Sequence, residues 1–125
     1  MRPLPDNLKD LSKPGNGKKQ IVINGNGWAD KLPYFLTAIC QAIEYNHSKT
    51  LRHLKFSETE LTDNMAAYII ERIGLDPSFK SLMHIDLSKN MMTDKFLEKF
   101  KNLLPNRRDK NPLFILQLAD NNLTA

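Results

Sequence analysis

Cysteine is nearly absent from this chain: Cys40 is its single cysteine among 125 residues, so no disulfide can form within it. This residue follows Ile39 and lies three positions before Ile43, on what we expect to be the apolar face of a helix. A lone thiol in such surroundings usually fills a small space in a core. The pattern of histidine and asparagine that accompanies a cysteine nucleophile is missing, so we predict that Cys40 is a buried thiol without a catalytic role.

Long apolar runs are missing as well. No segment reaches the roughly 20 apolar residues that a membrane-spanning helix needs, and the N-terminal MRPLPD lacks the apolar core of a signal peptide. We therefore expect no membrane partner. Together with the low cysteine content, this favours an intracellular protein, in the cytoplasm or, for a secreted effector, in the host cytosol.

Motifs for nucleotide chemistry and a basic stripe are also missing. The segment NGNG at residues 24–27 is not followed by the Gly-Lys-Ser/Thr of a phosphate-binding loop, so we expect neither an enzyme nor a cofactor. Eighteen basic residues against fourteen acidic ones give a net charge of +4. Because the basic residues form no stripe with interleaved aromatics, nucleic acid is disfavoured as a partner and an acidic protein is compatible.

What the chain does contain is an internal repeat. Three segments align without gaps: LRHLKFSETELTD at 51–63, LMHIDLSKNMMTD at 82–94 and LFILQLADNNLTA at 113–125, with a period of 31 residues. A weaker copy, KKQIVINGNGWAD, covers 18–30 and has Lys18 where the others have Leu. Three copies at one period predict a repetitive fold.

Each position of the repeat has a physical role. The apolar pair two residues apart, such as Ile85 and Leu87, predicts the inward face of a short strand. Between the repeats, apolar residues at spacings of three and four predict helices over residues 30–46, 63–73 and 94–104. Asp30, Asp63 and Asp94 stand at the helix starts, where we expect their carboxylates to cap free backbone amides.

This pattern, L-x-x-L-x-L-x-x-N-x-L-x-D, resembles the leucine-rich repeat family over about residues 18–125. The long period resembles the helix-containing, ribonuclease-inhibitor type. The resemblance implies an α/β solenoid of about four repeats, with a curved parallel sheet on the concave side and helices on the convex side. Its repeats would start near 18, 51, 82 and 113, after an N-terminal cap or leader at residues 1–17. In the family, the ninth side chain hydrogen-bonds neighbouring coils; here the ninth residues are Asn26, Thr59, Asn90 and Asn121.

Equivalent positions of stacked parallel strands form columns on the concave face, about 4.8 Å apart. These columns predict a mixed patch with a basic side, a central histidine pair and an apolar side. Lys55 should lie beside Asp86, and Glu58, Lys89 and Asp120 alternate in sign along a further column. The partner-binding residues predicted on this face are Lys19, Arg52, His53, Lys55, Met83, His84, Asp86, Phe114, Ile115 and Gln117.

The histidine pair admits two further interpretations. His53, His84 and Asp86 offer two imidazoles and a carboxylate, which could hold zinc. Repetition alone explains the pair, however, and Asp86 has Lys55 as a partner, so we expect no metal. A pH-sensitive binding face is favoured over a metal, since two neighbouring imidazoles resist double protonation.

The resemblance implies a non-enzymatic protein-interaction module, because repeat folds of this kind usually bind through the concave face. It would be a bacterial effector-type or cytosolic adaptor protein, or a fragment of one. The alternative is an accessory regulator of a GTPase or of the actin cytoskeleton, since similar long repeats occur in such proteins. The apolar strand at 113–118 would lie at the edge of the sheet, which also predicts self-association or pairing with a partner strand.

Overall fold

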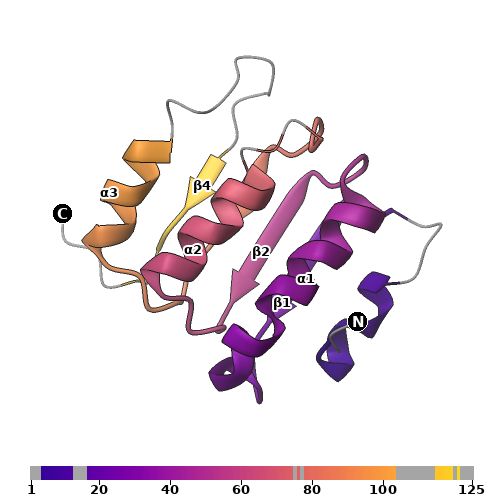
Figure 1. The fold of residues 1–125 in the computed structure, drawn as a ribbon, viewed down its shortest axis with the longest axis horizontal. Coiled ribbons are helices and arrows are strands. Elements are labelled where there is room, and N and C mark those ends of the chain that lie inside the picture. Colours follow the sequence, from indigo (N-terminus) through magenta and orange to yellow (C-terminus); the bar gives the residue numbers. More distant parts are fainter. Residues whose placement is uncertain are drawn as a thin grey trace.

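The computed structural model describes residues 4–12, 17–74, 76, 78–103, 115–119 and 121. Short strands alternate with helices along the chain, which has an α/β fold (Figure 1). The strands are β1 (Gln20–Asn24), β2 (His53–Ser57), β3 (His84–Asp86) and β4 (Ile115–Gln117). The α-helices are α1 (Leu32–His47), α2 (Asp63–Ile69) and α3 (Asp94–Leu103); η1 (Asp6–Ser12) and η2 (Ala29–Lys31) are 3-10 helices, and η3 (Ile70–Gly74) is a π-helical turn.

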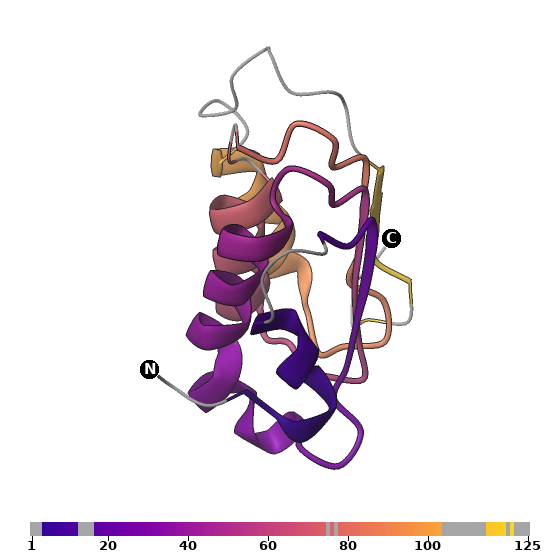
Figure 2. The same cartoon turned by 90° about the vertical axis from the view of Figure 1, so that its right-hand side faces the viewer.

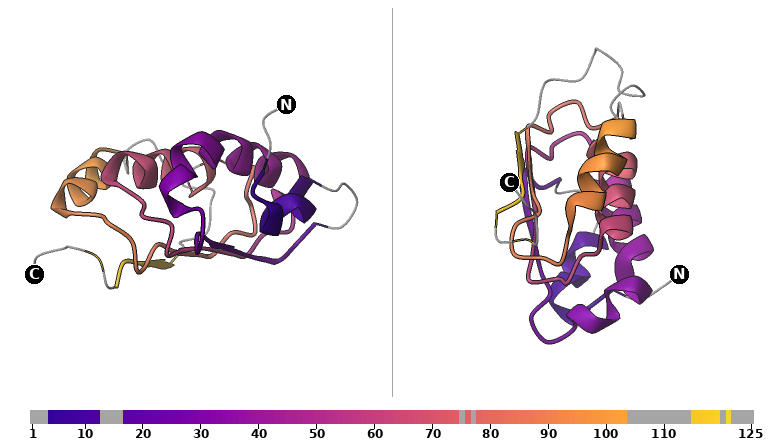
Figure 3. Two further views of the ribbon diagram at one scale, coloured as in Figure 1. Left: turned by 90° about the horizontal axis from the view of Figure 1, so that it is seen from below. Right: turned by 90° about the vertical axis from the view of Figure 1, so that its left-hand side faces the viewer.

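The four strands form one parallel sheet in the order β1-β2-β3-β4. Its register places Leu54 beside Ile85 and Ile85 beside Leu116, as the aligned repeats predict. The α-helices α1, α2 and α3 lie on one face of this sheet, and the residues that the structure describes place no helix on the opposite face (Figures 2 and 3). We call that opposite side the helix-free face.

The core lies between the sheet and the helices. Inward residues of the strands alternate with exposed ones, most clearly in β1, where Ile21 and Ile23 are buried. The helices supply the other half of the core, and the largest fully buried side chains include Phe56, Ile39 and Phe96. A period of two in the strands and of three or four in the helices therefore sets which residues meet.

Helices α2 and α3 begin at Asp63 and Asp94, as the sequence predicts, whereas α1 begins later and the predicted capping by Asp63 is not found. Helix α1 begins at Leu32, after Asp30, and α2 has Thr62 as its N-cap without a side-chain capping hydrogen bond. The Asp63 carboxylate instead accepts hydrogen bonds from the Thr93 amide (2.7 Å) and the Thr93 hydroxyl (2.6 Å) in the next repeat. The predicted capping role of Asp63 within its own helix is thus wrong, because the neighbouring repeat supplies two better-placed donors.

Asn90 joins two repeats. Its side-chain oxygen accepts from the amides of Thr59 and Leu61 and from the Thr59 hydroxyl, at 3.0, 3.3 and 2.7 Å. Its amide group donates to the carbonyls of Phe56, Leu87 and Ser88, at 2.8, 3.0 and 3.0 Å. The predicted role of Asn90 is therefore confirmed, since every turn group it contacts would otherwise need another partner.

Of the two equivalent asparagines, Asn121 behaves like Asn90 and Asn26 does not. Asn121 repeats the arrangement, with its amide 3.0 Å from the Leu87 carbonyl and its oxygen 3.1 Å from the Met92 amide. Asn26 departs from the prediction because its side chain is exposed, and its backbone amide donates to Asn24 Oδ1 at 2.8 Å. The described residues place no repeat before β1 for Asn26 to join.

The N-terminal segment packs beside α1 (Figure 1). Leu8 and Leu11 belong to the buried core, 4% and 2% exposed. Buried His47, at the end of α1, fastens this segment: its Nδ1 accepts from the Lys18 amide at 3.0 Å, and its Nε2 lies 3.0 Å from the Leu11 carbonyl. Since Nδ1 is the acceptor, Nε2 carries the proton that is donated to Leu11.

Candidate functional site

The helix-free face is the candidate binding surface, and the register brings the predicted residues together on it. His53 lies between Gln20 and His84, and His84 lies beside Ile115. One step along the strands, Lys55 lies beside Asp86, which lies beside Gln117. Lys19, Arg52 and Met83 precede the strands, and Phe114 lies outside the described residues.

Apolar side chains on this face are unusually open to solvent. Val22, Met83 and Ile115 are 47%, 55% and 62% exposed. Of their inward neighbours, Ile21, Ile23 and Leu82 are buried and Leu116 is half-buried, because these side chains face the helices. The alternation of the strands thus leaves Val22 and Ile115 uncovered, and Met83, just before β3, adds a third exposed apolar side chain. Protein-binding surfaces often have this composition.

The two histidines stack. The ring centroids of His53 and His84 are 4.2 Å apart and the rings are parallel within 5°. His84 Nε2 lies 2.7 Å from Gln117 Oε1 on the next strand, whereas His53 Nε2 is a buried atom without a hydrogen-bond partner. Burial and then the neighbouring His84 lower the pKa of His53, so the neutral imidazole is favoured here.

This stacking argues against a metal centre. Lone pairs of ring nitrogens lie in the ring planes, so two parallel stacked rings do not aim them at one point as zinc requires. Among the described residues, no group of three or more histidines, cysteines or acidic residues is arranged to hold a metal ion. The sequence could not predict this stacking, because the repeat determines which strands are neighbours but not how the two rings are oriented.

The predicted Lys55–Asp86 pair forms, with Nζ and Oδ2 3.9 Å apart. Burial by itself would raise the pKa of Asp86, but hydrogen bonds from Ser88, followed by the charges of Lys55 and His84, outweigh it and lower that pKa. The negative charge of Asp86 is therefore largely compensated by its contacts with Ser88 and Lys55. The exposed cations Lys19 and Arg52 are placed differently, at the strand starts.

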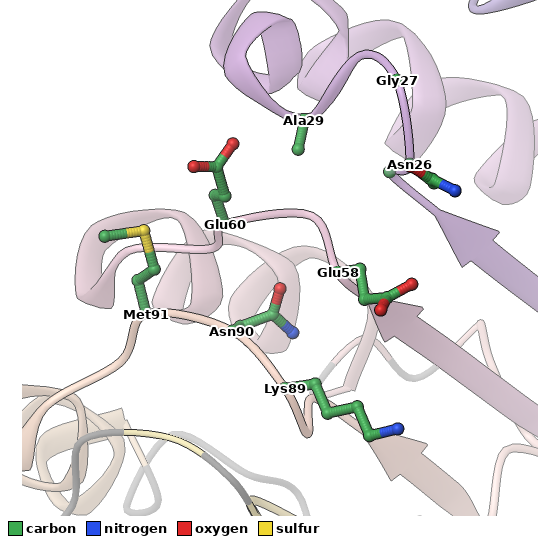
Figure 4. A pocket seen from close by; sticks show the side chains of 9 residues that line it. Asn26, Gly27, Ala29, Glu58, Glu60, Lys89, Asn90 and Met91 are labelled. Atoms are coloured by element: carbon green, nitrogen blue, oxygen red, sulfur yellow. The ribbon is translucent and has the colours of Figure 1, made fainter.

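A hollow lies at the C-terminal ends of the strands, where the loops that follow β1, β2 and β3 come together (Figure 4). Its volume is about 310 Å³, and its walls include Asn26, Glu58, Glu60, Lys89 and Met91. Glu58, Glu60 and Lys89 have positive φ values of 55°, 55° and 59°, which is uncommon outside glycine and asparagine. The sequence indicates the column that holds Glu58 and Lys89 but not this hollow, because nothing in the pattern signals these backbone angles. The third member of that column, Asp120, lies outside the described residues.

Comparison with known proteins gives a structural likeness and no match in sequence. No protein-family model matches the chain, and no curated protein matches it in sequence. Its structure is similar to a solved structure of leiomodin-1 actin-binding site 2, with a TM-score of 0.64 and 18% sequence identity. The alignment covers 91% of this chain and 60% of that chain, so this chain spans less than two thirds of its neighbour's length. At this identity the likeness shows the fold alone.

None of the helices within the described residues combines the length and the apolar character that crossing a bilayer requires.

Proposed function

We propose that this chain is a leucine-rich repeat solenoid that binds a partner protein through its helix-free face. The repetitive geometry supports the family assignment. Strands β2, β3 and β4 begin at His53, His84 and Ile115, at intervals of 31 residues. Asn90 and Asn121 make corresponding hydrogen bonds to carbonyls 34 residues before them, at Phe56 and Leu87.

The composition of the helix-free face is the observation that carries the binding role. Met83 and Ile115 are more than half exposed; Met83 adjoins Arg52, which precedes the neighbouring strand, and Lys19 lies one strand further on. Exposed apolar side chains next to polar and charged ones are common in protein-binding patches. The proposed contact residues are those predicted from the columns.

We propose a binding role without catalysis. Burial raises the pKa of the Cys40 thiol to about 12, so the thiolate that a nucleophile needs is not formed near neutral pH. Asp63 and Asp86 are occupied by hydrogen bonds with Thr93 and Ser88. In this proposal the module acts inside a cell.

Affinity capture with immobilised protein tests the binding role. The variant Arg52→Ala/His53→Ala/His84→Ala removes three side chains from the helix-free face, and Lys95→Ala/Lys99→Ala removes two exposed ones from α3. The account expects the partner to be lost with the first variant and kept with the second. A partner retained by the first variant and lost with the second would move the site to the helices.

Actin is a second candidate partner. The observation that favours it is the structural likeness to a protein described as an actin-binding site of leiomodin-1. Sedimentation with filamentous actin and binding to monomeric actin, each measured with the wild type and the triple alanine variant, test it. Absence of binding to both forms would remove actin and leave the interaction module in place.

A further inference from the structure

One end of the helix-free face carries a row of side chains in which charge gives way to apolar surface. Lys19, Arg52 and Met83 hold equivalent positions just before β1, β2 and β3, and all three are exposed. Backbone hydrogen bonds keep them adjacent: the Arg52 amide donates to the Lys19 carbonyl at 2.8 Å, and the Met83 amide to the Arg52 carbonyl at 2.9 Å. We call these three residues the N-terminal row. Ile115, beyond Met83, extends its apolar end, since the Ile115 amide donates to the Met83 carbonyl.

The positive charges of Lys19 and Arg52 in this row are available to a ligand. In the part of the chain that the structure describes, neither Lys19 nor Arg52 forms an ion pair. Nearby cations differ, because Lys18 is paired with Asp10 at 2.7 Å and Lys55 with Asp86. Two adjacent, exposed positive charges repel each other, so bringing a negative charge to them is favourable.

We propose that the N-terminal row binds an acidic segment of the partner protein in which carboxylate side chains adjoin an aliphatic one. This inference rests on the proposed function of the face. Two strand spacings of about 4.8 Å separate Lys19 from Met83, about the length of three extended residues. Carboxylates at one end of such a segment meet Lys19 and the two-pronged guanidinium of Arg52. An aliphatic side chain at the other end covers Met83 and Ile115, which are now open to water.

The chemistry of the face favours a peptide over nucleic acid. Glu58 is exposed just after the end of β2 and would repel a phosphate backbone that continued from Arg52 along that strand. Exposed tyrosines, on which bases could stack, are Tyr34 and Tyr45, and both belong to α1 in the helix layer. A short acidic segment needs contact with the row alone.

Binding of a defined probe tests the proposal on the full chain. The probe is a fluorescent peptide of sequence EDLEDLEDL, compared with the neutral peptide QNLQNLQNL and with a nine-nucleotide oligothymidine. Anisotropy gives the affinities, and amide chemical shifts in NMR spectra locate the contacts. We expect the acidic peptide to bind at least about tenfold more tightly than the neutral one, with shifts at Lys19, Arg52 and Met83 and with an affinity that falls as salt is added.

Two charge-reversal variants form a matched pair. Lys19→Glu/Arg52→Glu and Lys95→Glu/Lys99→Glu change the net charge equally, the first in the row and the second on α3. We expect the first to weaken peptide binding at least about tenfold and the second to change it less than about threefold. Circular dichroism reports whether each variant is folded, and Lys19→Gln/Arg52→Gln, which introduces no repulsion, must weaken binding in the same direction.

Equal losses in both reversal variants, equal binding of the neutral peptide, or tighter binding of oligothymidine would each overturn the proposal. The proposed function fails separately. A captured protein partner that depends on His53 and His84 but not on Lys19 would keep the face as the binding site and reject the acidic segment. A partner that depends on none of these residues would reject both.

Discussion

Replacing Asn90 by alanine should remove most of the stability of the chain. The side chain accepts three hydrogen bonds and donates three, and it is 8% exposed. Its loss leaves buried amides of the β2 turn, among them Thr59, without acceptors. Each unsatisfied buried group costs about 1–3 kcal/mol. Because these costs are not additive, we expect a total loss of about 4–5 kcal/mol, close to the whole stability of a marginal domain.

Asn26 provides the matched control. It holds the same position of the first repeat, but its side chain is exposed, and the hydrogen bond of its backbone amide to Asn24 does not need that side chain. Asn26→Ala should therefore change the free energy of unfolding by less than about 0.5 kcal/mol. Asn90→Asp is informative as well, because it keeps three acceptor contacts while losing all three donors.

Urea denaturation followed by circular dichroism measures these differences. The midpoint should fall strongly for Asn90→Ala while the denaturant slope stays near that of the wild type, because the surface exposed on unfolding is unchanged. A loss below about 1.5 kcal/mol for Asn90→Ala, or one equal to that of Asn26→Ala, would refute the reasoning that this side chain holds two repeats together.

Three further outcomes are expected. Thermal unfolding should show that Gly25→Ala destabilises the protein by more than about 2 kcal/mol, because the new Cβ would lie 2.5 Å from the Glu58 carbonyl oxygen. Gly27→Ala should cost only about 1 kcal/mol, because the space around Gly27 is open and only its φ of 91° is unfavourable for alanine. The pKa of His53 is lower in the folded protein than its ordinary value of about 6.5. The neutral His53 side chain therefore contributes its full stability above pH 6.5, and this contribution is lost as the pH falls through the pKa of the folded state. Melting temperatures from pH 7.5 to 5 should fall less steeply for His53→Gln than for the wild type, and equal slopes would contradict this. Light scattering should show association through the edge strand β4, abolished by Ile115→Lys; a monomeric wild type at high concentration would reject it.

The sequence predicts the sheet because its repeat carries two independent signals. The aliphatic pair fixes the inward face, so that Leu54, Ile85 and Leu116 become neighbours. The ninth position then predicts the role of Asn90, which is confirmed. Both signals are local and periodic, and a parallel stack of repeats converts periodicity directly into contacts.

Other contacts depend on distances between repeats that no periodic pattern contains. The Asp63 carboxylate can satisfy either its own helix or the Thr93 donors, and only the separation of the two repeats decides between them. His47 lies outside the repeat pattern and contacts Leu11, which is 36 positions away in sequence. Similarly, the strand register makes His53 and His84 neighbours, while side-chain rotation makes them stack.

Photocrosslinking at two single positions tests the central claim most directly. A benzoylphenylalanine is placed at Met83 on the helix-free face, 55% exposed, or at Leu97 on α3, 40% exposed, and each protein is irradiated with its captured partner. The account predicts a covalent adduct with the partner from position 83 and none from position 97. An adduct from position 97 alone would contradict it and place the partner on the helices.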